Sequence, residues 1–352
     1  MTTLLIMAGG TGGHVYPALS VAKEMKRRGV EVVWLGTRNG LEARAVPKAG
    51  FDIEWINIRG LRGTGVLGLV RTPFLLILAM FQTLGVVLRR RPAAVLGMGG
   101  FVSGPGALTA WLLRIPVLIH EANAVAGFTN RWLARLARTT MTGFPIQLGR
   151  RSIYVGNPVR EEIFSVPEPA QRLSGREGPL RVLVVGGSQG SLALNTRMPE
   201  LLPDAGRELE VRHQAGRDKA AGVREAWEAG GVRAEVTEFI DDMASAYAWA
   251  DLVICRAGAM TVAEVCASGS AAVFVPFPAA VGDHQSANAR LLCDRQAAWM
   301  WPESELGPEL VRDFFAGLDR AAIVERATRA REMAVPDSTR QVGERCMEVL
   351  HA

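Results

Sequence analysis

The chain has 352 residues, of which 49% are hydrophobic and 21% are charged, a composition typical of a globular protein with enough apolar material for two domains. Its formal net charge of +5 favours an anionic substrate or an anionic membrane surface, whereas dispersed Lys and Arg residues without interleaved aromatic residues argue against a nucleic-acid partner. Four cysteines without C-x-x-C spacing indicate reduced, mostly buried thiols of a cytoplasmic protein.

The first half of the chain alternates predicted strands with predicted helices. The strands are expected at residues 3–8, 31–35, 52–56, 93–97, 116–120 and 139–142, and the helices at 17–28, 66–90, 105–113 and 126–137. No charged segment precedes the first strand, which argues against a signal peptide. Strands that are apolar throughout indicate a parallel sheet covered on both faces, so the alternation predicts a doubly wound α/β domain.

An uncharged run covers residues 72–88, within the predicted helix 66–90. It is shorter than the ~20 apolar residues that a membrane-spanning helix needs. Three interpretations stay open: a buried helix of the domain, an interfacial helix lying in the membrane surface, or a spanning helix. The interfacial interpretation places Phe74, Leu75, Leu78 and Phe81 in lipid, with Arg89, Arg90 and Arg91 on anionic headgroups.

A segment rich in Pro, Gly and charged residues predicts an interdomain linker at residues 158–180. The second half repeats the alternation, with strands expected at 181–185, 209–214, 233–238, 251–255, 272–275 and 297–300, and helices at 190–201, 218–228, 259–268, 284–294, 308–331 and 337–350. We therefore expect two Rossmann-like domains, 1–159 and 160–336, facing each other across a cleft. The helical segment 337–352 is expected to pack back on the first domain.

Two glycine-rich loops each follow the first predicted strand of a domain. Residues 9–14 read Gly-Gly-Thr-Gly-Gly-His, and residues 186–190 read Gly-Gly-Ser-Gln-Gly. Glycines let backbone N–H groups approach an anion, and the following helix adds a favourable dipole. Neither loop has the G-x-G-x-x-G spacing of a dinucleotide site or a Walker lysine. The loops therefore predict sites for phosphorylated substrates and disfavour a nicotinamide oxidoreductase or an NTPase.

Four of the polar residues each have a structural and a functional interpretation. His14, at a helix start, is a capping residue or a general base, because imidazole titrates near neutral pH. Glu264, near the start of the predicted helix 259–268, stabilises the helix dipole or accepts hydrogen bonds from ribose hydroxyls. His120 and Glu121 form a structural pair or bind an acceptor.

Further candidates are Arg160, a surface charge or a guanidinium fork on a diphosphate, and Ser188, which satisfies the loop backbone or contacts a diphosphate. Ile240 is a core residue or offers main-chain hydrogen bonds to a base. Asp241 and Asp242 lack the additional ligands of a metal site, so we expect neither a metal nor a cofactor.

Eight strings of the sequence together resemble the MurG family of glycosyltransferases, over essentially the whole chain. They are residues 9–14, 97–105, 120–123, 156–160, 186–190, 237–243, 256–264 and 283–285. The resemblance implies a GT-B fold and inverting transfer of N-acetylglucosamine from UDP-N-acetylglucosamine to the muramic acid 4-hydroxyl of lipid I, giving lipid II at the cytoplasmic face of the bacterial inner membrane. Phe101 stands where tyrosine is frequent, and Ala257 where serine is frequent, so no hydroxyl role is expected at either position.

The resemblance also implies which residues contact each substrate. The donor residues are Thr11, Gly12, Gly13, Asn123, Arg160, Ser188, Ile240, Ala259, Met260, Thr261, Val262, Ala263, Glu264 and Gln285. The lipid-linked acceptor is expected at Gly100, Ser103, Gly104, His120 and Glu121, with His14 as the candidate base. Alternative functions are a UDP-N-acetylglucosamine 2-epimerase, a transferase of soluble acceptors and a non-catalytic sugar-nucleotide-binding module. None of these alternatives explains both the apolar run and His14.

Overall fold

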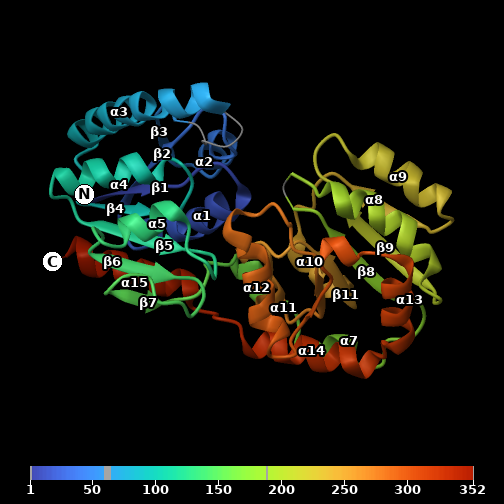
Figure 1. The fold of residues 1–352 in the computed structure, drawn as a ribbon. Coiled ribbons are helices and arrows are strands. Elements are labelled where there is room, and N and C mark those ends of the chain that lie inside the picture. Colours follow the sequence, from blue (N-terminus) through green and yellow to red (C-terminus); the bar gives the residue numbers. More distant parts are fainter. Residues whose placement is uncertain (1, 59–64, 188, 352) are drawn as a thin grey trace. The chain divides into compact units, whose positions relative to one another are not determined.

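A computed structural model describes residues 2–58, 65–187 and 189–351 of the chain (Figure 1). The chain divides into two compact units. Unit 1 comprises Met1–Arg160 and Asp337–Ala352, and unit 2 comprises Glu161–Pro336.

Unit 1 is built on a seven-stranded parallel sheet of order β3-β2-β1-β4-β5-β6-β7. The strands are β1 (Thr3–Met7), β2 (Glu31–Gly36), β3 (Asp52–Trp55), β4 (Ala94–Gly97), β5 (Val117–Glu121), β6 (Thr139–Thr142) and β7 (Ser152–Tyr154). Successive side chains of β1 enter different cores, because side chains alternate between the faces of a strand. Leu4 and Ile6 pack with α1 (Gly12–Arg27), α2 (Glu42–Lys48) and α15 (Ser338–Leu350), whereas Leu5 and Met7 pack with α3 (Gly65–Arg90), α4 (Ser103–Leu112) and α5 (Phe128–Leu133).

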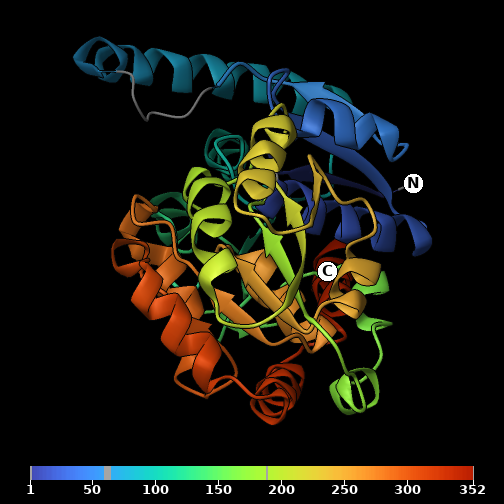
Figure 2. The ribbon, with the colours of Figure 1, turned by 90° about the vertical axis from the view of Figure 1, so that its right-hand side faces the viewer.

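Unit 2 repeats this topology, with the strand order β10-β9-β8-β11-β12-β13. The strands are β8 (Leu180–Val185), β9 (Leu209–Gln214), β10 (Ala234–Thr237), β11 (Leu252–Cys255), β12 (Ala272–Phe274) and β13 (Trp299–Met300). In Figure 2 these strands, coloured from yellow-green to orange, lie between helices. The helices are α6 (Glu161–Phe164), α7 (Pro169–Leu173), α8 (Leu192–Leu201), α9 (Ala220–Ala229), α10 (Met243–Trp249), α11 (Ala259–Ser268), α12 (His284–Cys293), α13 (Pro308–Gly317) and α14 (Arg320–Glu332).

The predicted linker at 158–180 is wrong, because residues 161–180 belong to unit 2. Their Pro and charged residues form the short helices α6 and α7. Arg172 of α7 is buried and donates to the carbonyl oxygens of Tyr247 at 2.7 Å, Ala250 at 3.0 Å and Gly269 at 2.6 Å. A segment anchored in this way is part of the domain core.

Several predicted helix boundaries also need correction. Helix α1 begins at Gly12 and not at residue 17, so that Pro17 lies inside it. The helix expected at 126–137 is only Phe128–Leu133. The helix expected at 308–331 is two helices, because Asp319 caps α14 by accepting a hydrogen bond from the backbone N–H of Ala322 at 2.6 Å.

From residue 73 onward, helix α3 presents most of its apolar side chains to solvent. The segment Pro73–Arg90 is long and apolar enough to cross a membrane, yet only 22% of it is buried. Phe74 is 73% exposed and Phe81 is 66% exposed, which contradicts the interpretation as a buried helix. Arg89 and Arg90 form ion pairs with Glu54 at 2.6 and 2.7 Å, so neither guanidinium is available in full for lipid headgroups.

The C-terminal helix α15 completes the core of unit 1. Its apolar side chains Val342, Cys346 and Val349 are buried in the same cluster as Val15 of α1. The Ser338 hydroxyl donates to the carbonyl oxygen of Asn157 at 2.7 Å, which fixes the start of the helix.

Candidate functional site

Each sheet has one point at which the strand order reverses direction. In unit 1 this switch point lies between β1 and β4, and in unit 2 it lies between β8 and β11. The helices that follow the two central strands leave toward opposite faces, which opens a crevice at the carboxyl ends of those strands. Both glycine-rich loops lie at these switch points, so the topology places them where ligands bind in open parallel sheets.

At the unit 1 switch point, the loop after β1 contacts the loop after β4. Gly100 has a φ of +83°, and a Cβ at this position would collide with the carbonyl oxygen of Gly9. Gly99 has a φ of +103°, and a Cβ there would lie 2.5 Å from Cδ2 of His14. Glycine is therefore required twice, both for backbone conformation and for close approach. The half-buried imidazole of His14 lies against this second loop.

The amino end of α1 is suited to an anion. Gly12, Gly13 and His14 form its first turn, and Thr11 precedes it in an extended conformation. The side chain of the N-cap residue Thr11 makes no hydrogen bond to this end. Backbone N–H groups at an uncapped helix start point toward solvent and carry a partial positive charge.

Glu42, at the start of α2, holds this loop by hydrogen bonds, a role that the sequence does not predict. Its carboxylate is fully buried and accepts hydrogen bonds from the backbone N–H of Gly10 at 2.9 Å and of Thr37 at 2.9 Å. It also accepts one from the Thr37 hydroxyl at 2.7 Å. A Cβ at Gly9 would lie 2.7 Å from the same carboxylate. Glu42 therefore ties the chain after β2 to the glycine loop.

Three of the five predicted acceptor residues are committed to internal hydrogen bonds. The buried Ser103 hydroxyl donates to the carbonyl oxygens of Met7 and Gly99, both at 3.0 Å. His120 Nε2 lies 3.0 Å from the carbonyl oxygen of Gly156, and burial lowers the pKa of this imidazole. Its structural interpretation is therefore favoured over direct contact with an acceptor.

Glu121 likewise organises its own loop. Oε1 accepts hydrogen bonds from the backbone and side-chain nitrogens of Asn123 at 2.9 and 3.1 Å. Oε2 accepts from the backbone N–H of Gly127 at 3.0 Å and from Asn130 at 2.9 Å. The carboxylate thus positions Asn123, a predicted donor residue. Of the remaining candidates, Gly104 lies in the first turn of α4 and Arg160 lies over the Tyr16 ring at 6.0 Å.

At the unit 2 switch point, the predicted donor residues Ala259, Met260, Thr261, Val262, Ala263 and Glu264 form the first two turns of α11. The N-cap residue is Gly258, which is extended and has no side chain with which to cap the helix. The loop after β8 lies at the same end of the sheet, and Gly187 has a φ of +83°. Ser188 lies outside the described residues, so its role stays a prediction from the sequence.

Glu264 is the sixth residue of α11, beyond the first turn in which a carboxylate stabilises a helix dipole. The dipole interpretation is therefore wrong. One oxygen of the half-buried carboxylate accepts a hydrogen bond from the Tyr247 hydroxyl at 3.2 Å. Gln285 accepts one from the backbone N–H of Phe277 at 2.9 Å, and Ile240 is half-buried in the loop after β10.

Asp242 has a structural role. Its Oδ1 accepts a hydrogen bond from the backbone N–H of Ser245 at 2.9 Å and caps α10. Over the described part of the chain, no group of three or more His, Cys, Asp or Glu side chains is arranged to hold a metal ion.

Comparisons with known proteins cover both units. Residues 4–142 match the glycosyltransferase family 28 N-terminal domain, and residues 181–338 match its C-terminal domain. The chain is 52% identical over 98% of both chains to a UDP-N-acetylglucosamine–N-acetylmuramyl-(pentapeptide) pyrophosphoryl-undecaprenol N-acetylglucosamine transferase of Alkalilimnicola ehrlichii. A relative of the same name from Bordetella petrii is 50% identical over 98% of this chain and 97% of its own.

Solved structures of glycosyltransferases also match this chain over nearly its whole length. The crystal structure of Acinetobacter baumannii MurG has a TM-score of 0.85 and 40% identity, and the match covers 99% of this chain and 100% of that one. The glycotransferase of kitacinnamycin, at 17% identity and a TM-score of 0.73, shares the fold.

Proposed function

Because this chain belongs to the MurG family of N-acetylglucosamine transferases, we propose which of its residues bind the donor, which bind the acceptor and which one acts as the base. The chain is a transferase that moves N-acetylglucosamine from UDP-N-acetylglucosamine to the lipid-linked muramyl pentapeptide. The match to these transferases over 98% of the chain is the observation that carries this function. It leaves no reason to prefer a 2-epimerase or a non-catalytic binding module.

Unit 2 takes the nucleotide sugar in this proposal. The uncapped start of α11 and the loop after β8 stabilise the charge that develops on the UDP leaving group, which is the electrostatic contribution that usually dominates. Glu264 accepts hydrogen bonds from the ribose hydroxyls. Ile240 offers its main chain to the uracil, and Gln285 contacts the sugar nucleotide.

Unit 1 takes the acceptor and supplies the base. His14 removes the proton from the attacking 4-hydroxyl, and the anomeric carbon is inverted in a single displacement. The backbone of Gly100 and Gly104 receives the diphosphate of the acceptor. Ser103, His120 and Glu121 hold these loops in place and do not touch the acceptor, because their polar atoms already have partners inside the unit. The resemblance also assigns Thr11, Gly12, Gly13, Asn123 and Arg160 of unit 1 to contacts with the donor.

A transfer assay with UDP-N-acetylglucosamine and a lipid I analogue tests the assignment of His14. The variant His14→Ala is expected to lose about 10²–10⁴-fold in kcat with little change in donor KM, because only the proton transfer is removed. His351→Ala, an exposed histidine after α15, serves as the matched control. Turnover of the His14 variant at the wild-type rate would show that another group is the base.

Glu264→Ala tests the donor site separately. We expect a donor KM raised by about tenfold or more and only a small fall in melting temperature, because the buried Tyr247 hydroxyl loses this acceptor; the exposed Glu332→Ala is the control. An unchanged donor KM would rule out the contact with ribose.

We further propose that the enzyme works at the cytoplasmic face of the bacterial membrane, with α3 lying in the lipid surface. The exposed side chains of Phe74, Leu78 and Phe81 support this location. Replacing all three by serine should release the protein from vesicles of anionic phospholipid and leave its activity on a soluble acceptor intact. Full vesicle binding by the triple variant would exclude α3 as the contact.

A further inference from the structure

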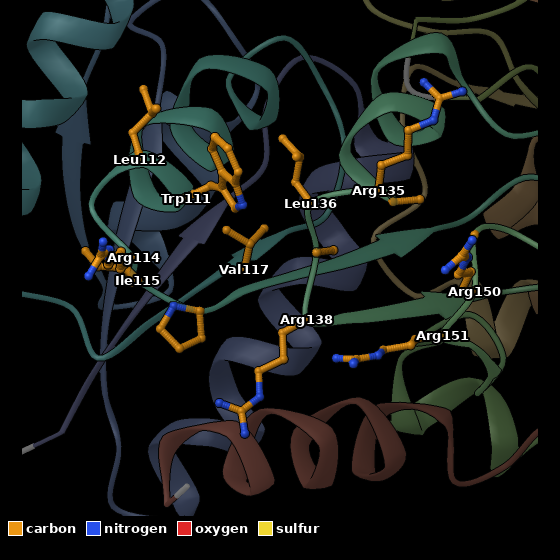
Figure 3. Close-up of a pocket in the computed structure, with 14 residues that line it drawn as sticks. Trp111, Leu112, Arg114, Ile115, Val117, Arg135, Leu136, Arg138, Arg150 and Arg151 are labelled. Carbon is orange, nitrogen blue, oxygen red and sulfur yellow. The ribbon is translucent and has the colours of Figure 1, made fainter.

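A hollow of about 1150 Å³ lies in unit 1 at the amino ends of β5, β6 and β7, and several arginines line it (Figure 3). In Figure 3 the side chains of Arg114, Arg135 and Arg138 point away from one another, so they do not surround a single ligand. Contacts that converge on one function lie instead in unit 2, where the end of β9 lies between two loops of the proposed donor site.

Gln214, the last residue of β9, is the residue between these loops. Strand β9 is flanked by β8 and β10 in the sheet. Gln214 is aligned with Val185, the last residue of β8, and with Thr237, the last residue of β10. The loop after β8 begins at Gly186, and the loop after β10 carries Ile240. Neighbouring strands are only about 4.8 Å apart, so a single side chain at the end of β9 can reach both loops.

The side chain of Gln214 donates a hydrogen bond to each loop. Its Nε2 donates to the carbonyl oxygen of Gly187 at 3.0 Å and to that of Glu238 at 2.8 Å. The residue is buried, with 3% of its surface exposed. A carbonyl oxygen only accepts hydrogen bonds, so the NH2 group, which has two hydrogens, must be the end of the amide that faces both loops. An ionised glutamate has no such hydrogens, and asparagine is one methylene shorter.

Neither carbonyl group depends on Gln214 for its only hydrogen bond. The carbonyl oxygen of Gly187 also accepts from the backbone N–H of Gly190 at 2.8 Å, and that of Glu238 accepts from the backbone N–H of Gly216 at 3.1 Å. Because a carbonyl oxygen has two lone pairs, the amide of Gln214 takes the second position on each. Removal of the amide would therefore leave neither carbonyl group unsatisfied, and its main effect would be to disconnect the two loops.

The backbone beside Gln214 is anchored in the core of unit 2. The carbonyl oxygen of Ala215 accepts a hydrogen bond from Asn195 Nδ2 at 2.9 Å, and Asn195 Oδ1 lies 3.1 Å from Nε2 of the buried His213. A Cβ at Gly190, whose φ is +71°, would collide with the same carbonyl oxygen of Ala215. The loop after β8 therefore packs directly on the end of β9, and the amide of Gln214 extends from a fixed point.

We propose that Gln214 is a positioning residue of the donor site, which fixes the spacing between the diphosphate loop after β8 and the uracil loop after β10. This inference rests on the proposed function, which assigns the diphosphate to the first loop and the uracil to the main chain of Ile240. Glu238 lies two residues before Ile240 in the second loop. The uracil and the diphosphate of the donor are joined covalently, so a nucleotide that reaches both loops binds more tightly when their spacing is fixed before binding.

Three variants test this role by transfer kinetics, thermal unfolding and calorimetric titration with UDP. Gln214→Met has a side chain of similar length but lacks both donors. Gln214→Asn keeps the amide, which now reaches at most one carbonyl group. The control Ser270→Ala removes a buried hydroxyl that lies 2.8 Å from the Ser268 hydroxyl, two residues before β12 and therefore at the opposite edge of the same sheet.

Both Gln214 variants should raise the donor KM and the Kd of UDP by about tenfold and leave the acceptor KM unchanged. A merely structural role would lower kcat through a smaller folded fraction and leave both KM values unchanged. Ser270→Ala should keep the wild-type KM values. A donor KM and a UDP Kd within about twofold of the wild type in folded Gln214 variants, or an equal rise in the control, overturns the proposal.

Uridine separates a link between the loops from damage to one of them. Uridine lacks the diphosphate and therefore reaches only the uracil loop and the ribose contacts. Its affinity, measured by calorimetric competition with UDP, should change less than about twofold in the Gln214 variants. Equal losses for uridine and UDP would mean that Gln214 shapes the uracil loop alone, which contradicts the proposal. Absence of transfer by the wild-type enzyme would instead contradict the proposed function, and the titrations with UDP and uridine would still decide the role of Gln214.

Discussion

Replacing Glu42 by glutamine tests whether a buried carboxylate holds the glycine-rich loop of unit 1, which carries the proposed base His14, in place. Glutamine keeps the shape of the side chain, and its amide oxygen can still accept both hydrogen bonds from Thr37. Its NH2 group, however, would face the backbone N–H of Gly10, which now donates to the carboxylate at 2.9 Å. One bond to a charged group is lost and two donors oppose each other, which costs about 1.5–3 kcal/mol.

For a domain of this size that cost lowers the melting temperature by about 3–12 °C. The larger effect is expected on kcat, because Gly10 precedes the helix start that carries His14. A displacement of a reacting group by about 1 Å costs up to ~10²-fold in rate, so kcat should fall by about 10–100-fold.

Transfer kinetics and thermal unfolding of three variants distinguish positioning from stability. Thr37→Val removes one bond to Glu42 but leaves that of Gly10, so it should destabilise unit 1 and spare kcat. Glu31→Gln, which weakens only the bond from the Thr3 hydroxyl at the opposite sheet edge, should change neither quantity appreciably. A Glu42→Gln enzyme with wild-type kcat and stability would refute the reasoning.

Three further predictions concern stability. Burial lowers the pKa of His213 from 6.5 to about 4, so between these pH values the unfolded chain binds a proton at this residue and the folded chain does not. The free energy of unfolding should therefore fall by about 3 kcal/mol as the pH is lowered from 6.5 to 4. Denaturant titrations of His213→Gln should lack this loss. Arg172→Met removes three hydrogen bonds to buried carbonyl groups and should cost about 3 kcal/mol or more in unit 2; a smaller loss in urea unfolding would contradict the anchoring role. Gly100→Ala should destabilise unit 1 by clearly more than Gly50→Ala, which costs about 1–2 kcal/mol for its φ of +77° and meets no neighbour; equal calorimetric shifts would mean that the loop yields freely.

The parts of the fold that the sequence predicts well are those with local signals. Strand β1 is an apolar run that ends in glycines, and α11 matches its predicted bounds because an apolar strand and Gly258 precede it. The sequence does not predict helix α2, because the helix has seven residues and contains Pro47. It does not predict β7, because three residues show no periodicity. The division of 308–331 had a local signal in Asp319, a preferred N-cap residue that the helical pattern on both sides obscured.

In the site too, the sequence predicts the features that have local signals and does not predict the others. The loops at both switch points follow from glycine placement and strand order. The partners of individual side chains do not, because they are distant in sequence. His120 contacts the carbonyl group of Gly156, and Glu42 accepts a hydrogen bond from the N–H group of Gly10. No local sequence pattern predicts either contact. From the sequence alone, Glu42 is expected at the surface. Only the fold shows the three hydrogen-bond donors that surround its carboxylate.

Helix α15 has a consequence for the order in which the protein matures. Its apolar side chains fill the same core as Val15, yet the ribosome reaches them only after the whole of unit 2 has been synthesised. At ~5–20 residues per second, residues 161–336 occupy roughly 10–35 s of translation. Throughout that interval α1 exposes an apolar surface on the nascent chain, whereas unit 2 is contiguous and has all its core residues as soon as it leaves the ribosome. The unit whose synthesis starts first is therefore the last to acquire a complete core, and chaperone binding during translation should concentrate on it.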